Sequence, residues 1–339
     1  MTRENLEKLI DREYKNDVNF INCMIKLKKL AKYKAKFGYT SLGLFISTIV
    51  LSILSFLSGF LFGETAFKMV IFITFAMGVS TIVMFLLFIN ICSSKRGIFK
   101  YYEKVAKYYL SEDKLSRIYV ELFEDSYLAT TVTDIEFKVN NHIIEYYKNL
   151  ENFYETRFNK KMNSVNNLVF KFKGKRALFF TNNPYLTIIS NGKSSTTYYT
   201  TIGEFYLKNE KFDSAYNNIK IIPGTKHDIN YQTESITFND KYDINIKDND
   251  IRAPMFLTPK LIDRLTKIKI SKYFKEFGIK KNFYVFHEST SSYIMDSPLG
   301  VIDFSSIKSY QDFKDKAVIK ITRDFYLLSR SIQYVDCVY

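Results

Sequence analysis

The sequence predicts an α+β protein in which an N-terminal transmembrane helical hairpin is followed by a cytoplasmic domain of mixed sheet and helix. Three observations indicate this class: two long apolar segments near the N-terminus, paired β-type runs in the middle, and helical patterns toward the C-terminus. With 339 residues, 47% of them hydrophobic, the chain can also build a sizeable core. We divide it into a helix (1–36), the hairpin (37–92), a juxtamembrane helix (93–113) and the α+β domain (114–339).

Residues 1–36 are expected to form a basic amphipathic helix on the cytoplasmic side. Apolar side chains recur every three or four residues along one face: Leu6, Ile10, Tyr14, Val18, Ile21 and Ile25. Such a stripe needs a partner surface. We expect it to pack on the C-terminal domain or on a neighbouring copy, in preference to serving as a dedicated binding helix.

Two uncharged segments, residues 37–62 and 69–92, are predicted to cross a membrane. They hold 26 and 24 residues, which correspond to about 39 and 36 Å of helix at about 1.5 Å per residue. The stretch GETAFK between them carries Glu64 and Lys68 and is expected to turn the chain at the far surface. The alternative is a single re-entrant hairpin. Small residues that would let the two helices pack closely are Ser52, Ser55, Gly59, Ala76 and Ser80.

Basic residues flank this hairpin on both sides, whereas the turn is nearly neutral. Those expected to contact anionic lipid are Lys26, Lys28, Lys29, Lys32, Lys34, Lys36, Lys95, Arg96 and Lys100. This asymmetry predicts a multi-pass membrane protein with both termini in the cytoplasm. An anionic inner leaflet as partner accounts for the net charge of +14, so a nucleic-acid partner is not expected.

After the second segment, Phe99, Tyr102, Ala106 and Tyr109 share one helical face, so the membrane helix is expected to continue until SEDKLS interrupts it. The middle region is predicted to be a sheet. NLVFKFKGKRALFFT contains two β-rich runs around a glycine turn, and YLTIISNGKSSTTYYTTI contains an Asn-Gly hairpin turn. ESITFNDKYDINI is expected to be a strand pair or a bent strand, and residues 134–162 are ambiguous between strand and helix.

The pair Thr258-Pro259 predicts a helix start, because the threonine hydroxyl can accept a backbone N–H and proline suits the first helical position. This helix should bury Leu261, Leu265 and Ile268 and end near Gly278.

A hairpin around residues 289–292 is expected to follow that helix. A terminal helix should come last, with Ile321, Phe325 and Leu328 buried.

One stretch, FNDKYDINIKDNDIRAPMFLTPKLIDRL, carries a family resemblance. Its spaced apolar strand positions and its strand-to-helix junction are Phe238, Tyr242, Ile244, Leu257, Thr258 and Pro259. With these residues the chain resembles the bacterial membrane proteins grouped as domain-of-unknown-function family three-one-three-seven. The order of parts is also similar over most of the chain: paired membrane helices, a basic extension, a β-rich middle, then strand, helix, hairpin and C-terminal helix.

The chain departs from this family by a one-residue slip between Ile244 and Ala253 and by divergence before Val165. The resemblance implies the architecture of paired membrane helices before a cytoplasmic domain, and it implies a location in the bacterial inner membrane. It implies no activity, because the family has none assigned.

Candidate chemistry is sparse. Asp243, Asp248 and Asp250 lack the glycine and the glutamate of a calcium loop, so a solvated turn at a strand end is expected. The histidines and cysteines do not stand at metal-ligand spacing; they are His142, His227, His287, Cys23, Cys92 and Cys337. His287 is expected to be exposed. No nucleophile elbow, P-loop or dinucleotide fingerprint is present, and no cofactor is expected.

Three classes of function follow. The favoured one is a membrane-anchored cytoplasmic binding or scaffold module that is not an enzyme. The alternative is an oligomeric membrane effector, whose soluble domain senses a signal and whose two spans alter permeability. An enzyme with an unrecognised site is the third. A homo-oligomer and an unidentified protein partner are both left open.

Overall fold

The computed structural model describes residues 2–61, 64–92, 97–139, 165–182, 185–190, 192, 194–224, 230–292, 302 and 304–338. The chain forms two compact units whose segments alternate along the sequence. We name them the hairpin unit (Asp11–Tyr109 and Phe304–Asp315) and the sheet unit (Met1–Ile10, Leu110–Asp303 and Lys316–Tyr339).

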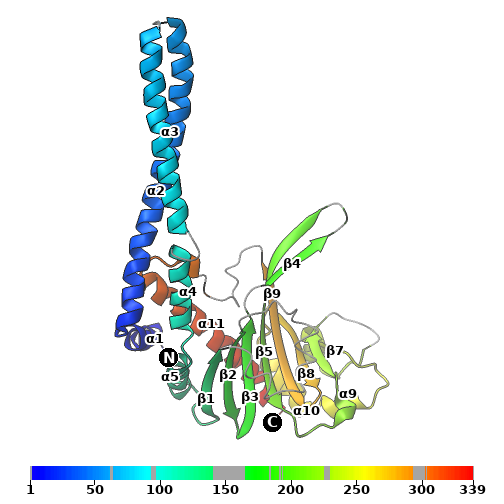
Figure 1. The fold of residues 1–339 in the computed structure, drawn as a ribbon. Helices are drawn as coiled ribbons and strands as arrows, with labels where there is room; N and C mark the ends of the chain where they lie inside the picture. Colours follow the sequence, from blue (N-terminus) through cyan, green and yellow to red (C-terminus); the bar gives the residue numbers. More distant parts are fainter. Residues whose placement is uncertain are drawn as a thin grey trace. The chain divides into compact units, whose positions relative to one another are not determined.

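The hairpin unit is helical (Figure 1). Its elements are η1 (Asp11–Lys15), α2 (Val18–Leu61), α3 (Glu64–Cys92), α4 (Ile98–Tyr109), η4 (Phe304–Ser306) and the first residues of α11 (Tyr310–Asp336). Two segments, Val18–Ser55 and Phe67–Cys92, are long and apolar enough to cross a membrane. The turn between them is shorter than expected, because Glu64 already begins α3 and pairs with Lys68 at 2.6 Å within its first turns.

Helices α2 and α3 contact each other through residues spaced alternately three and four apart. On α2 these half-buried or buried positions are Ser41, Leu44, Thr48, Leu51 and Ser55, and on α3 they are Val70, Thr74, Met77, Thr81, Met84 and Phe88. This spacing is that of left-handed coiled-coil packing. Across the contact, Thr48 Oγ1 and Thr81 Oγ1 lie 3.4 Å apart.

The small residues predicted for this contact are mostly elsewhere. Ser55 lies on the facing side, but Ser52, Ala76 and Ser80 are exposed, so these three do not form the contact between α2 and α3. Each lies one position from a contact residue, a rotation of about 100° around the helix. Gly59 belongs to α2, and the structure does not describe whether it is buried.

The single N-terminal stripe expected from sequence is wrong beyond Tyr14. α1 (Arg3–Ile10) is followed by a π-helical turn, and α2 restarts at Val18, where Asp17 Oδ1 accepts from the Phe20 amide at 3.0 Å. After this restart a different set of side chains is buried, so Val18 and Ile25, which were expected to be on the buried stripe, are 71% and 60% exposed. The buried positions of this part of α2 are Phe20, Cys23, Met24 and Leu27.

The buried face of α4 differs from the expected one at two positions, where Ile98 and Val105 are buried in place of Phe99 and Ala106. Phe99 is 42% exposed, and the buried positions are Ile98, Tyr102, Val105 and Tyr109. A bend at Gly97 precedes α4, so it is a helix separate from α3. Its end packs in an aromatic cluster with Tyr14 and Phe313, and Tyr14 donates its hydroxyl to the Tyr109 carbonyl at 2.8 Å.

The sheet unit combines an antiparallel sheet with helices (Figure 1). Its helices are α1, α5 (Glu112–Glu124), α8 (Ile236–Lys241), α9 (Arg252–Phe256), α10 (Pro259–Lys267), the short η3 (Ser214–Tyr216) and most of α11. Its strands are β1 (Val132–Val139), β2 (Val165–Phe172), β3 (Lys175–Asn182), β4 (Tyr185–Ser190), β5 (Ser195–Lys208), β6 (Lys220–Pro223), β7 (Tyr242–Ile244), β8 (Phe274–Lys280) and β9 (Phe283–Ser292). Their order is β1-β2-β3-β5-β9-β8-β6-β7, with β4 paired to β5.

Local sequence predicts two of the hairpins correctly. β2 and β3 are joined through Lys173 and Gly174, whose φ angles of 48° and 77° match a turn that twists with its strands. β4 and β5 pair around Gly192, whose φ is 78°.

The order after α10 differs from the prediction. The helix ends at Lys267, and Gly278 lies inside β8. The hairpin is formed by β8 and β9 around Lys281, whose φ is 51°, while residues 289–292 complete β9.

The stretch ESITFNDKYDINI also contains a helix that was not expected. Ser235 caps α8 by accepting from the Phe238 amide at 3.3 Å, and only Tyr242–Ile244 is a strand. Of the ambiguous region 134–162, the part within β1 is a strand, and residues 140–162 lie outside the described residues.

One face of the sheet packs against α5, α10 and α11. Phe286 pairs with Phe205 across β5 and β9, and its ring lies 4.8 Å from that of Tyr334 on α11. The helix approaches closely at Gly203, where a Cβ would lie 2.3 Å from Leu327 Cδ2. Because side chains alternate along a strand, Glu288 faces α11 whereas Glu204 and His287 face the other way.

Candidate functional site

The lysines expected to meet lipid lie mostly on the surface of the hairpin unit. Those that are exposed are Lys26, Lys28, Lys29, Lys32, Lys36 and Lys100. Lys34 is half-buried, and its Nζ lies 5.9 Å from the centre of the Phe99 ring. Lys95 and Arg96 lie outside the described residues.

Thr258 and Pro259 have the local roles that their sequence indicates. Thr258 Oγ1 accepts from the Leu261 amide at 3.3 Å, and Pro259 is the first residue of α10. Leu261 and Leu265 are buried, while Ile268 follows the helix and is half-buried.

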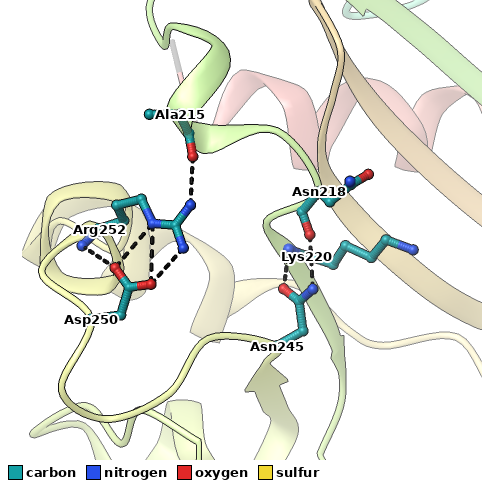
Figure 2. Close-up of polar contacts among 6 residues, drawn as sticks. All are labelled: Ala215, Asn218, Lys220, Asn245, Asp250 and Arg252. Carbon is teal, nitrogen blue, oxygen red and sulfur yellow. Dashed lines mark hydrogen bonds and ion pairs between the residues drawn. The ribbon is translucent and has the colours of Figure 1, made fainter.

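Two of the three aspartates considered as a cation loop, Asp243 and Asp250, have other partners, and Figure 2 shows those of Asp250. Asp250 accepts from Arg252 Nη2 at 2.6 Å, and Arg252 Nη1 donates to the Ala215 carbonyl at 2.6 Å. The hydrogen bonds from Arg252 lower the pKa of Asp250 to about 2. The expectation of a solvated turn is wrong for Asp243. This residue is only 4% exposed, and its carboxylate accepts a hydrogen bond from the Asn230 side chain at 3.1 Å.

The same loops are joined by a second link, also drawn in Figure 2. The Asn245 side chain accepts from the Lys220 amide at 2.6 Å and donates to the Asn218 carbonyl at 2.8 Å. Side-chain hydrogen bonds therefore join the segments around β6 and α9.

His287 is buried, contrary to the expectation that it is exposed. It is 7% exposed because β9 is an inner strand with β5 and β8 on its two sides. Its Nδ1 lies 3.8 Å from one oxygen of Glu204 and 3.8 Å from one oxygen of Glu276. Glu276 also pairs with Lys220 Nζ at 2.7 Å, and Glu204 accepts from the Tyr206 hydroxyl.

These groups form a polar cluster on the sheet face that points away from α11. Glu276 has the Lys220 ammonium as its partner and Glu204 has the Tyr206 hydroxyl, so each carboxylate has a contact that offsets its loss of hydration. Among the described residues, no group of three or more histidine, cysteine or acidic side chains could hold a metal ion.

A cavity of about 520 Å³ lies in the sheet unit beside α1, α5 and α11. α11 contributes Phe325, Tyr326, Ser329 and Arg330 to its wall. Apolar atoms make up most of the surface that the wall exposes to the cavity, although many of its side chains carry a polar group. This combination of size and lining is typical of sites for small molecules.

The charged side chains among the described residues of this wall are all cations: Arg3, Lys269 and Arg330. They come from α1, from the segment after α10 and from α11. Arg3 also pairs with Glu7 at 2.8 Å, and its side chain is 65% exposed.

Arg330 is the most constrained of the three. Its side chain is 12% exposed, it pairs through Nη2 with Glu288, and its guanidinium lies 4.7 Å from the centre of the Tyr326 ring. Burial raises the pKa of Glu288 to about 7, although Arg330 and a hydrogen bond from Ser271 oppose the rise. The pair therefore places a cation at the wall above a carboxyl group that is easily protonated.

Sequence reasoning missed this pocket. One signal was present, since Tyr326 and Arg330 stand four residues apart and so share a face of the terminal helix. Glu288 and Lys269 gave no signal, because long-range pairing of β9 and the path after α10 bring them near that helix. Comparisons with protein-family models, with curated proteins and with solved structures give no match for this chain.

Proposed function

We propose that this protein is a membrane-anchored binding module of the bacterial inner membrane. In this proposal the α2–α3 hairpin is the anchor, both termini are cytoplasmic, and the sheet unit binds a ligand in the pocket beside α11. The resemblance to the domain-of-unknown-function family agrees with this arrangement and adds no activity.

The exposure of the two apolar helices carries the proposal. Of their most apolar 18-residue windows, only 6% and 0% are buried. A core helix of a water-soluble protein with this composition would be covered by other parts of the chain. Large apolar surfaces left uncovered indicate a membrane or a partner, and both segments have the length that a bilayer requires.

The charge distribution supports the orientation. Six exposed lysines lie on α2 before the uncharged segment 37–62 and on α4 after the uncharged segment 69–92, whereas at the other end of the helix pair Glu64 is paired with Lys68 in the first turns of α3. Lysines at this place favour the cytoplasmic side and an anionic leaflet.

The topology is tested by labelling single cysteines in intact cells, after Cys23, Cys92 and Cys337 have been replaced by serine. We expect a membrane-impermeant maleimide to label Thr65→Cys in intact cells and Thr2→Cys only after lysis. The reverse pattern would overturn the orientation, and release of the full chain by alkaline carbonate would overturn the anchor.

One observation favours a second candidate, an oligomeric effector. Ser52, Ala76 and Ser80 are exposed on the hairpin, so close packing of these small residues requires another molecule. This candidate predicts ion conductance when the purified chain is added to planar bilayers, and an absence of conductance together with a monomer in native membranes would exclude it.

A further inference from the structure

We propose that the pocket beside α11 binds a small organic anion with a flat aromatic body, whose acid group meets Arg330 and Lys269 while its ring lies against Tyr326. This inference rests on the proposed function and specifies the chemical class of its ligand. Three features of the pocket carry it: the sign of its charges, the place of its aromatic rings and the support behind Arg330.

The sign of the charges selects an anion. Arg3, Lys269 and Arg330 reach the wall from three separate segments, and no acidic side chain is among the described residues that line it. Arginine offers a planar fork of donors that matches carboxylate, sulfonate or phosphate oxygens. A cationic ligand would be repelled, and a neutral ligand would leave these side chains without new contacts.

The aromatic rings select the body of the ligand. Tyr127, Phe325 and Tyr326 are in the wall, and the Arg330 guanidinium is already in contact with the Tyr326 ring. A flat ring bound beside that ring can stack in offset or edge-to-face geometry, with its acid group directed at the guanidinium. A volume of about 520 Å³ admits a molecule of this kind.

The carboxyl group of Glu288 positions Arg330. Glu288 is 1% exposed and engages Nη2, while Nε of Arg330 has no hydrogen-bond partner among the described residues. The guanidinium is thus held at the wall from one side by a buried carboxyl group. Fixing it in advance reduces the entropy that a ligand must offset on binding.

Naphthalene-2-sulfonate and naphthalene-2-sulfonamide test the inference, because they share one ring system and differ in charge. Equilibrium dialysis uses the full chain in phosphatidylcholine nanodiscs, with empty nanodiscs as the blank. We expect the sulfonate to bind at least about tenfold more tightly, which is the effect of one charge-assisted contact. Lys269→Gln should reduce this preference.

Removing Arg330 alone would leave Glu288 buried without its cation, so the second variant is Arg330→Gln combined with Glu288→Gln. We expect it to abolish the preference for the sulfonate. Arg323→Gln is the matched control, since Arg323 is exposed on the same helix and is not part of the pocket wall. It should bind like the original chain.

The outcomes separate the inference from the proposed function. Equal binding of both compounds, or a sulfonate preference that survives the Lys269 and Arg330 variants, overturns the anion class and leaves a membrane-anchored module with another ligand. Failure of both compounds to bind also overturns the inference, while the labelling experiment still decides the anchor.

Discussion

In the sheet unit Phe205 and Phe286 are fully buried, whereas in the hairpin Phe72 and Phe75 are 73% and 70% exposed. The same side chain is therefore used in opposite ways. In the first region it leaves water by packing on other parts of the chain, and in the second the chain leaves it uncovered, where the proposed anchor would place lipid. Exposure of apolar residues is then evidence about the surroundings of a region rather than a defect of its packing.

Polar groups differ between the two regions in the same manner. In the hairpin, hydroxyls bond the backbone of their own helix: Thr48 Oγ1 donates to the Leu44 carbonyl at 2.7 Å. In the sheet unit, polar side chains pair over long distances in sequence, as Glu288 does with Arg330. A lipid-facing helix must satisfy its groups locally, whereas a folded sheet can bring partners together.

The largest expected change in stability comes from filling a close contact between two backbones. The sheet unit has such a contact at Gly278, whereas the outer face of the hairpin has none at Gly43. In Gly278→Ala the new Cβ would lie 2.0 Å from the Ile219 carbonyl oxygen, so the β6–β8 pairing must open. We expect a loss of about 3 kcal/mol or more in the free energy of unfolding, measured by urea denaturation in detergent.

Gly43→Ala is the control for this comparison, because outside the local backbone of its own helix no atom lies within 4 Å of the added Cβ. It should change stability by less than about 1 kcal/mol, in the stabilising direction. Equal losses for both variants would mean that β6 and β8 do not approach as described.

A charge on the outer face of α3 tests whether lipid surrounds it. Val79 is 46% exposed, so in water Val79→Lys would change stability by less than about 0.5 kcal/mol. In a bilayer we expect a cost of about 3 kcal/mol and a reduced fraction of inserted chains. Insertion is measured by labelling Thr65→Cys in the same chain, and unchanged labelling would contradict the membrane assignment.

The pH dependence of stability tests the buried pair of the sheet unit. Glu288 faces Arg330 and Tyr334 from α11 and Ser271 from the segment before β8. Burial raises its pKa from 4.5 to about 7 in the folded protein, so the folded state binds the proton more tightly. Its contribution is fully present below about pH 4.5 and is lost as the pH rises through about 7.

The full change corresponds to about 3 kcal/mol at about 1.4 kcal/mol per pH unit. Urea denaturation of the original chain and of Glu288→Gln between pH 4 and 8 measures it. The difference in unfolding free energy should move in favour of the variant as the pH rises. A difference that is constant with pH would show that the pKa of Glu288 is the same in the folded and unfolded states.

The smallest expected effect concerns the cap of α10. Thr258→Ala removes the hydrogen bond to the Leu261 amide and should cost roughly 0.5 to 2 kcal/mol, whereas Thr258→Ser keeps the hydroxyl and should cost less than about 0.5 kcal/mol. Thermal melts of the full chain compare the two. A similar loss in both variants would assign the effect to the methyl group rather than to the cap.

Sequence by itself determined the features that depend on near neighbours. The two apolar segments follow from continuous stretches without charge, the β2–β3 turn follows from a Lys-Gly pair, and the start of α10 follows from Thr258 and Pro259. Each is decided within a few residues by backbone preference, capping or solvent. Which face of a helix is buried was predicted less well. The π-helical turn at Asp11–Lys15 changes which side chains of α2 are buried, and the spacing of apolar residues does not indicate such a turn.

Tertiary structure alone decided the polar interior and the pocket. His287 looked like the end of a strand, yet β5 and β8 enclose it and place Glu204 and Glu276 beside it. Glu288 and Arg330 are 42 residues apart and meet only because β9 packs under α11. The physical reason is that burial and pairing of these groups arise from strand register and helix packing, which join residues that the sequence holds far apart.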